Sequence, residues 1–515
     1  MLVKTFGSAV YGVEAITITV EVNAMSTNIG QVMVGLADNA VKESIQRIES
    51  TMRTNGYAMP RMRTVINLAP ADIKKSGTAF DLPIAIGILA ADEKIKNPEA
   101  ISSYIIMGEL SLDGEIRPIK GALPIAIQAR KEKFKGLIVP KVNAREAGMV
   151  NNLNVYGVEH IREVIDFFEN GEQGLEPVVI NTREEFLHAQ ADFEIDFADV
   201  KGQENIKRAL EIAAAGGHNA ILIGPPGAGK TMLAKRLPTI LPPLSLQEAL
   251  ETTKIHSVAG KLPENATLIS KRPFRSPHHT ISDVALVGGG GIPQPGEISL
   301  AHNGVLFLDE LPEFKRTVLE VMRQPMEERR VTISRAKVAI DFPSSFMLIA
   351  SMNPCPCGFY NHPEKECSCP PGAVQKYLNK ISGPLLDRID LHVEVTPVAF
   401  RELSSVKTSE HSADIRARVM KAREMQEERY KESPGTYCNA QMSSKQLKEI
   451  CVIDNVSQNL LKAAMEKLNL SARAYDRILK VSRTIADLNE SEIIKAEHVA
   501  EAIQYRSLDR EGWGG

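Results

Sequence analysis

An eight-residue stretch near the middle of the chain has the composition of a phosphate-binding loop. It fits G-x-x-x-x-G-K-[ST] and consists of Gly224-Pro225-Pro226-Gly227-Ala228-Gly229-Lys230-Thr231. The apolar run Ala220–Ile223 before it predicts a buried strand, and residues 232–237, beginning with Met232, predict the first turns of a helix. In this context glycines let backbone N–H groups approach phosphates, Lys230 reaches the β/γ oxygens and the Thr231 hydroxyl holds Mg²⁺. The sequence therefore predicts a site for a nucleoside triphosphate and Mg²⁺.

A second apolar run ends in two carboxylates. Residues 304–310 read Gly-Val-Leu-Phe-Leu-Asp-Glu, which predicts a buried parallel strand followed by Asp309 and Glu310. Beside a phosphate-binding loop, Asp309 would hold Mg²⁺ and its water, and Glu310 would polarise the water that attacks the γ-phosphate. A strand that ends in two solvated acids is the alternative. The neighbouring loop favours the hydrolytic interpretation.

These elements resemble the nucleotide site of AAA+ ATPases, and two further segments extend the resemblance. Residues 196–203 look like the entry segment of such modules, which implies that Val200, Gly202 and Gln203 lie against the adenine. Asn353 follows another buried run, 346–352, and looks like the sensor-1 asparagine that orients the attacking water.

Two arginines carry the resemblance toward magnesium chelatases and MCM helicases. Residues 383–390, Gly-Pro-Leu-Leu-Asp-Arg-Ile-Asp, resemble their arginine-finger stretch, which implies that Arg388 acts on ATP held by the neighbouring subunit. Taken alone, the same residues are typical of a surface helix end. Arg473 begins a C-terminal helix and matches the sensor-2 position, from which it would contact the γ-phosphate when the lid closes.

Residues 329–340 alternate as two strands with a turn at 335–337. They resemble the presensor-1 hairpin of MCM helicases, which implies that Arg335 and Lys337 grip the DNA backbone in a hexameric ring. Basic residues at a hairpin tip also protect edge strands from aggregation, so this alternative stays open. An insertion at 271–296 contains His278 and His279, which strand alternation would place on opposite faces, as surface or packing residues rather than metal ligands.

Four cysteines form a pattern that the nucleotide site does not explain. Cys355, Cys357, Cys367 and Cys369 give C-x-C-x9-C-x-C in a loop containing proline and glycine. Two such pairs can supply a tetrahedral zinc site. The C-x-C spacing is tighter than the usual C-x2-C, so four structural thiols remain the alternative. Cys438 and Cys451 are isolated and predicted to be packing residues.

Residues 1–168 resemble the α+β proteolytic domain of Lon proteases, which shares a fold with a ribosomal-protein domain. The pattern includes a strand at 17–22, helices at 38–52 and 80–91, and a hairpin at 108–117. Lon-type peptidases use a Ser–Lys dyad, but here Thr78 falls at the nucleophile and Leu123 at the lysine. A dyad of Ser76 and Lys120 is the alternative. The resemblance implies a domain without peptidase activity that serves as a scaffold or guides DNA.

Composition and segmentation complete the prediction. The chain has 515 residues and a formal net charge of −3, so a DNA-binding surface must be local. We find no signal peptide and no run long enough for a membrane span, and expect a cytoplasmic protein. The expected divisions are 1–168, a linker at 169–193, an α/β AAA+ core at 194–398 and a helical lid at 399–515.

Nearly the whole chain resembles the YifB/ComM family of magnesium-chelatase-like AAA+ proteins. The segments 274–280 and 295–314 are the most specific. The resemblance implies a hexameric DNA helicase that promotes branch migration during natural transformation. One alternative is the ATPase subunit of a metal chelatase, although such subunits lack the Lon-like domain. Another is a Lon-like ATP-dependent protease, which Leu123 opposes.

Overall fold

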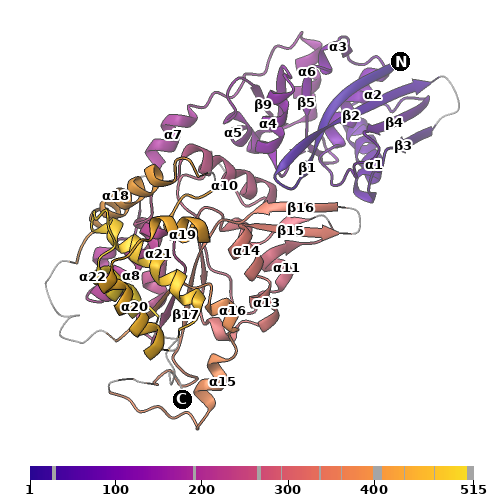
Figure 1. The fold of residues 1–515 in the computed structure, drawn as a ribbon. Coiled ribbons are helices and arrows are strands. Elements are labelled where there is room, and N and C mark those ends of the chain that lie inside the picture. The colour runs from indigo at the N-terminus through magenta and orange to yellow at the C-terminus, as the bar shows by residue number, and fades with distance from the viewer. Residues whose placement is uncertain are drawn as a thin grey trace.

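The computed structural model describes residues 1–25, 30–189, 193–263, 268–291, 293–335, 338–360, 362, 364–397, 409–433, 435–468 and 470–506. The N-terminal part forms one end of an elongated molecule, and the remaining chain forms the other (Figure 1). The fold class is the predicted one, a mixed α/β chain with a parallel sheet in its second part.

A seven-stranded sheet organises the N-terminal part, in the order β3-β4-β2-β1-β5-β8-β9. β1, β2 and β4 pair antiparallel, whereas β5, β8 and β9 are parallel to one another. The strands of the sheet are β1 Leu2–Tyr11, β2 Glu14–Met25, β3 Gly30–Val34, β4 Arg63–Ala69, β5 Tyr104–Ile106, β8 Gly136–Pro140 and β9 Asn154–Val158; β6 Glu109–Leu110 and β7 Ile116–Arg117 form the expected separate hairpin. The helices are α1 Asn39–Thr54, α2 Asp81–Ala91, α3 Pro98–Ile101, α4 Ala122–Lys131, α5 Lys141–Gly148, α6 Ile161–Glu169 and α7 Thr182–Ala189.

Helix α2 is the core of this part, because all of its residues are buried. Its sequence is apolar on most sides, as the prediction for residues 80–91 required. The segment expected to be an irregular linker differs from the prediction. It contains helix α7, and Phe186 on that helix is buried in a cluster with Ala144 and Met149. One buried aromatic residue anchors α7, so the sequence shows no periodicity that would reveal the helix.

The second part is built on a five-stranded parallel sheet in the order β11-β14-β17-β10-β18. Its strands are β10 Ala220–Ile223, β11 Phe274–Arg275, β14 Val305–Leu308, β17 Met347–Met352 and β18 Leu391–Glu394. Two small antiparallel hairpins are formed by β12 Gly288–Gly289 with β13 Gln294–Pro295 and by β15 Arg330–Arg335 with β16 Val338–Pro343. The helices are α8 Glu204–Gly216, α9 Lys230–Arg236, α10 Leu246–Ala259, α11 Asp283–Val287, α12 Glu297–Leu300, α13 Arg316–Glu320, α14 Arg323–Glu328, α15 Ala373–Leu378 and α16 Gly383–Leu386, with 3-10 turns at Phe197–Asp199, Leu237–Thr239 and Leu311–Glu313.

The C-terminal helices form a bundle, as predicted. They are α18 Ser412–Tyr430, α19 Ser444–Ile450, α20 Asn455–Lys467, α21 Ala472–Leu488 and α22 Ala496–Gln504, with a 3-10 turn at Asn439–Gln441. The helices expected from the sequence are 413–430, 444–451, 456–468, 472–488 and 493–505. Most observed ends lie within two residues of these, and α22 begins three residues later than expected. Buried residues of α18 and α21 share one apolar cluster with α8 and strand β10, so the bundle packs directly on the part that contains the parallel sheet.

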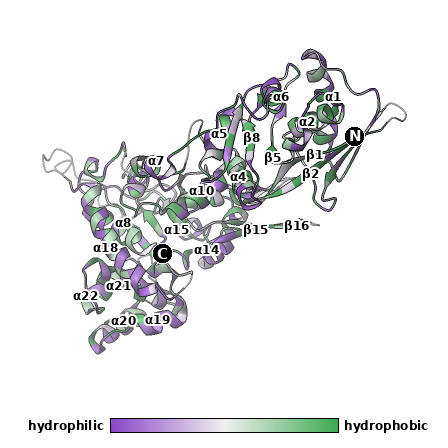
Figure 2. Cartoon of the chain, turned by 90° about the horizontal axis from the view of Figure 1, so that it is seen from above, coloured by the Kyte–Doolittle hydropathy of each residue, from purple (hydrophilic) through white to green (hydrophobic). Residues whose placement is uncertain are grey.

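The N-terminal part contacts the second part at helix α10 and at strand β16. Helices α4 and α10 lie side by side (Figure 2), and the Gly121 N–H donates to the Ser257 carbonyl at 3.1 Å. The turn between β1 and β2 rests on β16, because a Cβ added at Gly12 would lie 2.9 Å from the Ile340 Cγ2 atom. Among the described residues, no helix has the length and apolarity needed to cross a bilayer.

Candidate functional site

Three neighbouring parallel strands bring the predicted nucleotide residues to one edge of the sheet. β17 lies between β14 and β10, with Leu308 paired to Ala350 and Ile223 paired to Met352. Parallel strands end at the same edge, where α/β proteins commonly bind ligands. The loop after β10, the acids after β14 and Asn353 after β17 therefore lie together.

The loop between β10 and α9 has the backbone that its glycines predict. Gly227 and Gly229 have φ values of +78° and +83°, which favour glycine. A Cβ added at Gly224 would lie 2.3 Å from the Val395 carbonyl oxygen, so this position has no room for a side chain. Helix α9 begins at Lys230, and the N-terminus of a helix favours anionic groups.

Lys230 is buried and interacts at the centre of the site. Its Nζ donates to the carbonyls of Gly224 at 2.6 Å and Pro225 at 3.0 Å, and to the Asn353 Oδ1 at 3.2 Å. Burial lowers the pKa of Lys230, while the charges of Asp309 and Glu310 oppose that shift. The structure thus brings the predicted lysine and the predicted sensor asparagine into direct contact.

The predicted magnesium residues also meet. The Thr231 hydroxyl donates to Asp309 Oδ2 at 2.8 Å, and the Ser351 hydroxyl donates to Asp309 Oδ1. Hydroxyl and carboxylate oxygens are ligands that suit Mg²⁺, so the donor set fits this ion. Ser351 also accepts a hydrogen bond from the Glu310 N–H at 3.3 Å. Ser351 was not predicted; its only signal is a hydroxyl in an otherwise apolar strand.

His279 lies beside Glu310, and its predicted orientation was wrong. The rings of His278 and His279 are 4.1 Å apart rather than on opposite faces, because the chain turns here instead of continuing as a strand. The His279 Nδ1 atom is 3.7 Å from Glu310 Oε2. His279 therefore contacts the carboxylate that is predicted to activate water.

The entry segment is attached to the phosphate-binding loop. Gln203 adopts a φ of +60°, and its amide donates to the Ala228 carbonyl at 2.8 Å. Val200 is buried in the core cluster, and Gly202 has a φ of +63°. Met232 is exposed on the first turn of α9. The placement of these residues against adenine stays a prediction.

Arg388, predicted to act on ATP of the neighbouring subunit, and Arg473, predicted to act from the lid, lie close to each other. Arg388 donates to the Pro384 carbonyl and pairs with Glu327. The Arg473 NH1 atom pairs with Asp387 Oδ2 at 2.9 Å, and Asp387 directly precedes Arg388. Their roles toward ATP stay predictions. The predicted DNA residues are not placed: Lys337 lies outside the described residues, and of Arg335 only the backbone, at the end of β15, is described.

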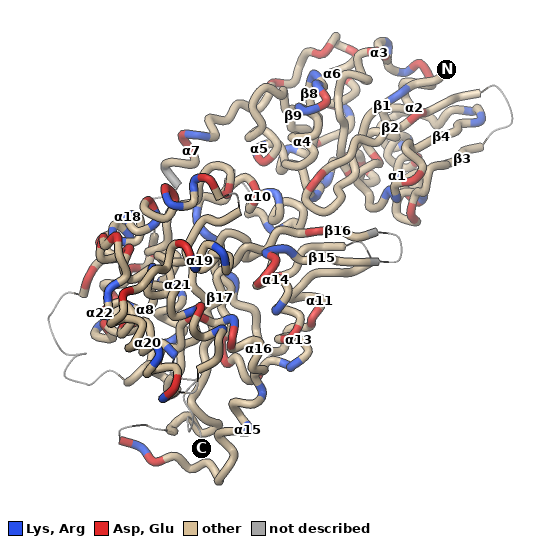
Figure 3. Tube along the Cα trace, in the orientation of Figure 1, with Lys and Arg blue, Asp and Glu red and all other residues tan. Residues whose placement is uncertain are grey.

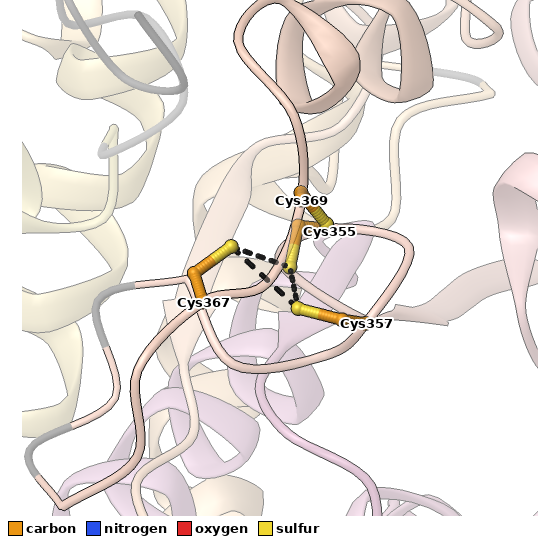
Figure 4. Close-up of side chains that lie close together, drawn as sticks. All are labelled: Cys355, Cys357, Cys367 and Cys369. Atoms are coloured by element: carbon orange, nitrogen blue, oxygen red, sulfur yellow. Dashed lines mark hydrogen bonds between the residues drawn. The ribbon is translucent and has the colours of Figure 1, made fainter.

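The four predicted cysteines converge (Figure 4). Their sulfur atoms all lie within 4.8 Å of one another. The Cys355 sulfur is 3.3 Å from that of Cys357 and 3.7 Å from that of Cys367, and the latter two are 3.5 Å apart. Four zinc–sulfur bonds of about 2.3 Å in a tetrahedron require sulfurs about 3.8 Å apart. The cluster therefore fits a zinc ion.

The Lon-like positions carry no dyad. Leu123 is fully buried, and its N–H donates to Glu146 at 2.9 Å. Thr78 donates its hydroxyl to Glu109. The alternative lysine, Lys120, packs its aliphatic chain on Gly260 of the ATPase core. Among the described residues we find no hydrogen bond between Lys120 and Ser76.

Comparisons with known proteins agree with this architecture. Residues 196–403 match the family described as magnesium chelatase, subunit ChlI; residues 20–143 match subunit ChlI of Mg-chelatase; residues 409–506 match the C-terminal region of subunit ChlI. The competence protein ComM of Haemophilus influenzae is 43% identical over 99% of this chain and 98% of its own.

Two further relatives complete the comparison. The YifB protein of Escherichia coli is 44% identical over 98% of this chain and 96% of its own. Lon protease 2 of Bacillus subtilis is 33% identical over 154 residues, 27% of this chain and 26% of its own, which supports a Lon-like region. The chain belongs to the YifB/ComM family of magnesium-chelatase-like AAA+ ATPases.

Proposed function

We propose that this protein is a hexameric motor that hydrolyses ATP to move along DNA, acting as a helicase that promotes branch migration during recombination or natural transformation. The observation that carries the ATPase half is the contact of Lys230 with Asn353 beside the Thr231–Asp309 pair. Lys230 binds the phosphates, Thr231 and Asp309 hold Mg²⁺, Asn353 orients the attacking water and Glu310 polarises it. Mg²⁺ neutralises charge on the phosphate oxygens.

Arg388 supports the proposal that the protein forms a ring of subunits. In this structure its partner is Glu327, an exposed residue, and not a group of its own nucleotide site. An arginine provided by the next subunit stabilises the charge of the transition state. A ring of subunits would therefore complete each ATP site with Arg388 of a neighbour.

The proposed action on DNA is supported by the β15–β16 hairpin and by the similarity to the competence protein ComM. Lys and Arg are interspersed with Asp and Glu along the trace of both parts of the molecule (Figure 3), and the net charge of the chain is −3, so the proposed DNA contact is a local one. Basic residues at the β15–β16 tip, Arg335 and Lys337, would contact phosphates locally. The name of the Haemophilus influenzae relative assigns that protein to competence, which fits a task on incoming DNA.

The proposal also includes zinc and a cytoplasmic location. Zinc is supported by the convergence of the four sulfurs within 4.8 Å of one another, with Cys355 buried and the other three cysteines partly exposed. All six cysteines lie among the described residues, and none of them is in a disulfide. Free thiols are typical of the reducing cytoplasm.

Unwinding of a forked DNA by the purified protein tests the function, with casein as the competing substrate. We expect ATP-dependent unwinding and no casein cleavage. The double variant Arg335→Ala with Lys337→Ala should bind DNA more weakly and with a shallower salt dependence, because fewer counterions are released. Its DNA-independent ATP hydrolysis should survive.

A matched control is Lys445→Ala with Lys448→Ala, which removes the same charge from exposed positions of α19. This control should unwind DNA normally. Normal unwinding by the hairpin variant would exclude the hairpin as the DNA grip. Casein cleavage without unwinding would favour a protease, and ATP hydrolysis without either would favour a chelatase-like ATPase subunit.

A further inference from the structure

The four-cysteine cluster is attached to the nucleotide site at two points. The first is the chain itself, because Asn353 is separated from Cys355 only by Pro354. Asn353 contacts Lys230, and Cys355 is fully buried. The Tyr360 N–H donates to the Cys355 sulfur at 3.3 Å, which closes the turn that follows. The position of Cys355 therefore constrains the position of the sensor asparagine.

The second attachment is a direct contact with the phosphate-binding loop. Gly358 lies between the two cysteine pairs and is buried, with a φ of +84°. A Cβ added at Gly358 would lie 2.5 Å from Pro226 Cδ. The backbone of the cysteine loop thus packs against the loop that is proposed to hold the phosphates.

The cysteine loop lines a cleft together with residues that are proposed to act on ATP. The cleft has a volume of about 430 Å³, and its lining includes Glu310, Asn353, Pro356 and Tyr377. Pro356 stands between Cys355 and Cys357, and Tyr377 lies on α15, which follows Cys369. The cysteine loop therefore forms part of the wall beside the carboxylate that is proposed to activate water.

We infer that a zinc ion held by these four thiolates is a required part of the ATP-hydrolysing machinery, because it fixes Asn353 and the wall of the cleft against the phosphate-binding loop. This inference rests on the zinc site and the ATPase proposed above. Metal binding supplies free energy that orders a loop, here one in which nine residues separate the two pairs of ligands. Without the ion, the segment from Cys355 to Cys369 loses that constraint. Asn353 then loses its fixed position while the phosphate-binding loop keeps its own glycine backbone.

Loss of the zinc ion should therefore affect ATP hydrolysis and nucleotide binding differently. Catalytic geometry is sensitive to displacement, and a shift of about 1 Å costs on the order of 100-fold in rate. Affinity for ATP depends mainly on the phosphate-binding loop and Lys230, which carry no cysteine. Loss of the metal should lower the hydrolysis rate at least about tenfold and leave nucleotide affinity nearly unchanged.

The experiment uses the full-length protein, treated with a strong zinc chelator and then dialysed. Elemental analysis gives the zinc content, a fluorescent ATP analogue reports affinity, and phosphate release reports hydrolysis at constant Mg²⁺. We expect near-stoichiometric zinc before treatment, lost hydrolysis after it, and recovery on adding Zn²⁺ alone. The double variant Cys367→Ser with Cys369→Ser should behave like the chelated protein, whereas Cys438→Ser with Cys451→Ser should keep its zinc and its activity.

A second variant tests the contact without touching a ligand. Gly358→Ala should keep its zinc but hydrolyse ATP more slowly, because the new methyl group pushes against Pro226. Gly372→Ala is the matched control: its φ is +76°, and a Cβ there meets nothing within 4 Å. Circular dichroism spectra and thermal melts confirm that each variant is folded.

The outcomes separate the inference from the function on which it rests. If the protein is isolated with zinc but hydrolyses ATP equally well once the zinc is removed, the inference is wrong and the zinc site still stands. Protein that never retains zinc would overturn both the site and the inference. Zinc-loaded wild-type protein without any ATP hydrolysis would overturn the proposed ATPase itself, and the inference with it.

Discussion

Lys230 and Glu310 are proposed to act on different steps, so their substitutions should separate binding from hydrolysis. Lys230→Ala removes the cation that faces the phosphates and should abolish ATP binding. Glu310→Gln keeps the shape of the side chain but cannot polarise water, so ATP should bind and remain intact. Equilibrium binding of a fluorescent nucleotide and phosphate release measure the two effects. Wild-type turnover by Glu310→Gln would remove Glu310 from the mechanism.

Ser351 offers a second test at the scale of one side chain. Its hydroxyl donates to Asp309 and accepts the Glu310 N–H, and it is fully buried. A hydrogen bond to a charged group typically contributes about 1.5–3 kcal/mol. Ser351→Ala should therefore raise the Mg²⁺ concentration needed for half-maximal hydrolysis, and Ser351→Thr should restore it in part. A magnesium titration that is identical for all three proteins would contradict this role.

The residues that could be predicted are those whose motif fixes their place along the chain. Lys230, Thr231 and Asp309 belong to patterns with a defined spacing, and the structure brings them together. Ser351 and His279 belong to no such pattern. Their contacts with Asp309 and Glu310 depend on strand order and on a turn, which are set by packing over distances that spacing does not report.

Helix α21, which lies in the part expected to form a lid, is attached to the segment that carries the proposed arginine finger. Arg473 and Arg477 lie one turn apart on α21 and pair with Asp387 and Asp390, each at 2.9 Å. Burial alone would raise the pKa of Asp390, but Arg477 and His218 outweigh burial and hold the pKa well below its usual range. The carboxylate is therefore charged in the folded protein.

Asp390→Asn should lower the free energy of unfolding by about 3–5 kcal/mol near neutral pH, because it leaves Arg477 without its buried partner. A depressed folded-state pKa contributes stability above the unfolded value, about 3.9, and the contribution is lost as pH falls toward the folded value. The difference from wild type should therefore shrink below about pH 4. Denaturant unfolding at several pH values measures it. The control Glu466→Gln changes an exposed carboxylate and should have little effect at any pH.

Helices could be predicted from the sequence where apolar residues recur along one face. The bundle helices α18 to α21 have apolar residues at helical spacing, and their predicted ends agree with the structure within about two residues. Helix α7 was missed because a single residue, Phe186, anchors it. The two histidines were placed on opposite faces because their segment was treated as a strand. In both cases tertiary contacts outweighed the local pattern.

At the scale of the whole molecule, the proposed ring implies that two inactive variants can restore ATP hydrolysis when they are mixed. Arg388→Ala should leave nucleotide affinity nearly intact and cripple hydrolysis, since its proposed target lies in the next subunit. Mixing it with the Lys230→Ala variant creates interfaces in which an intact loop faces an intact arginine. Phosphate release should then recover in part. Unchanged inactivity of the mixture, together with hydrolysis that does not depend on protein concentration, would argue for a monomeric ATPase.

The seating of the β15–β16 hairpin against the N-terminal part has a mechanical consequence. Tyr11 and Val13 pack on the cluster that contains Ile333 and Ile340, and Gly12 leaves no gap at Ile340. The hairpin cannot rock relative to the seven-stranded sheet without breaking this contact. If the hairpin moves during ATP hydrolysis, as the proposed function requires, the seven-stranded sheet must therefore move with it.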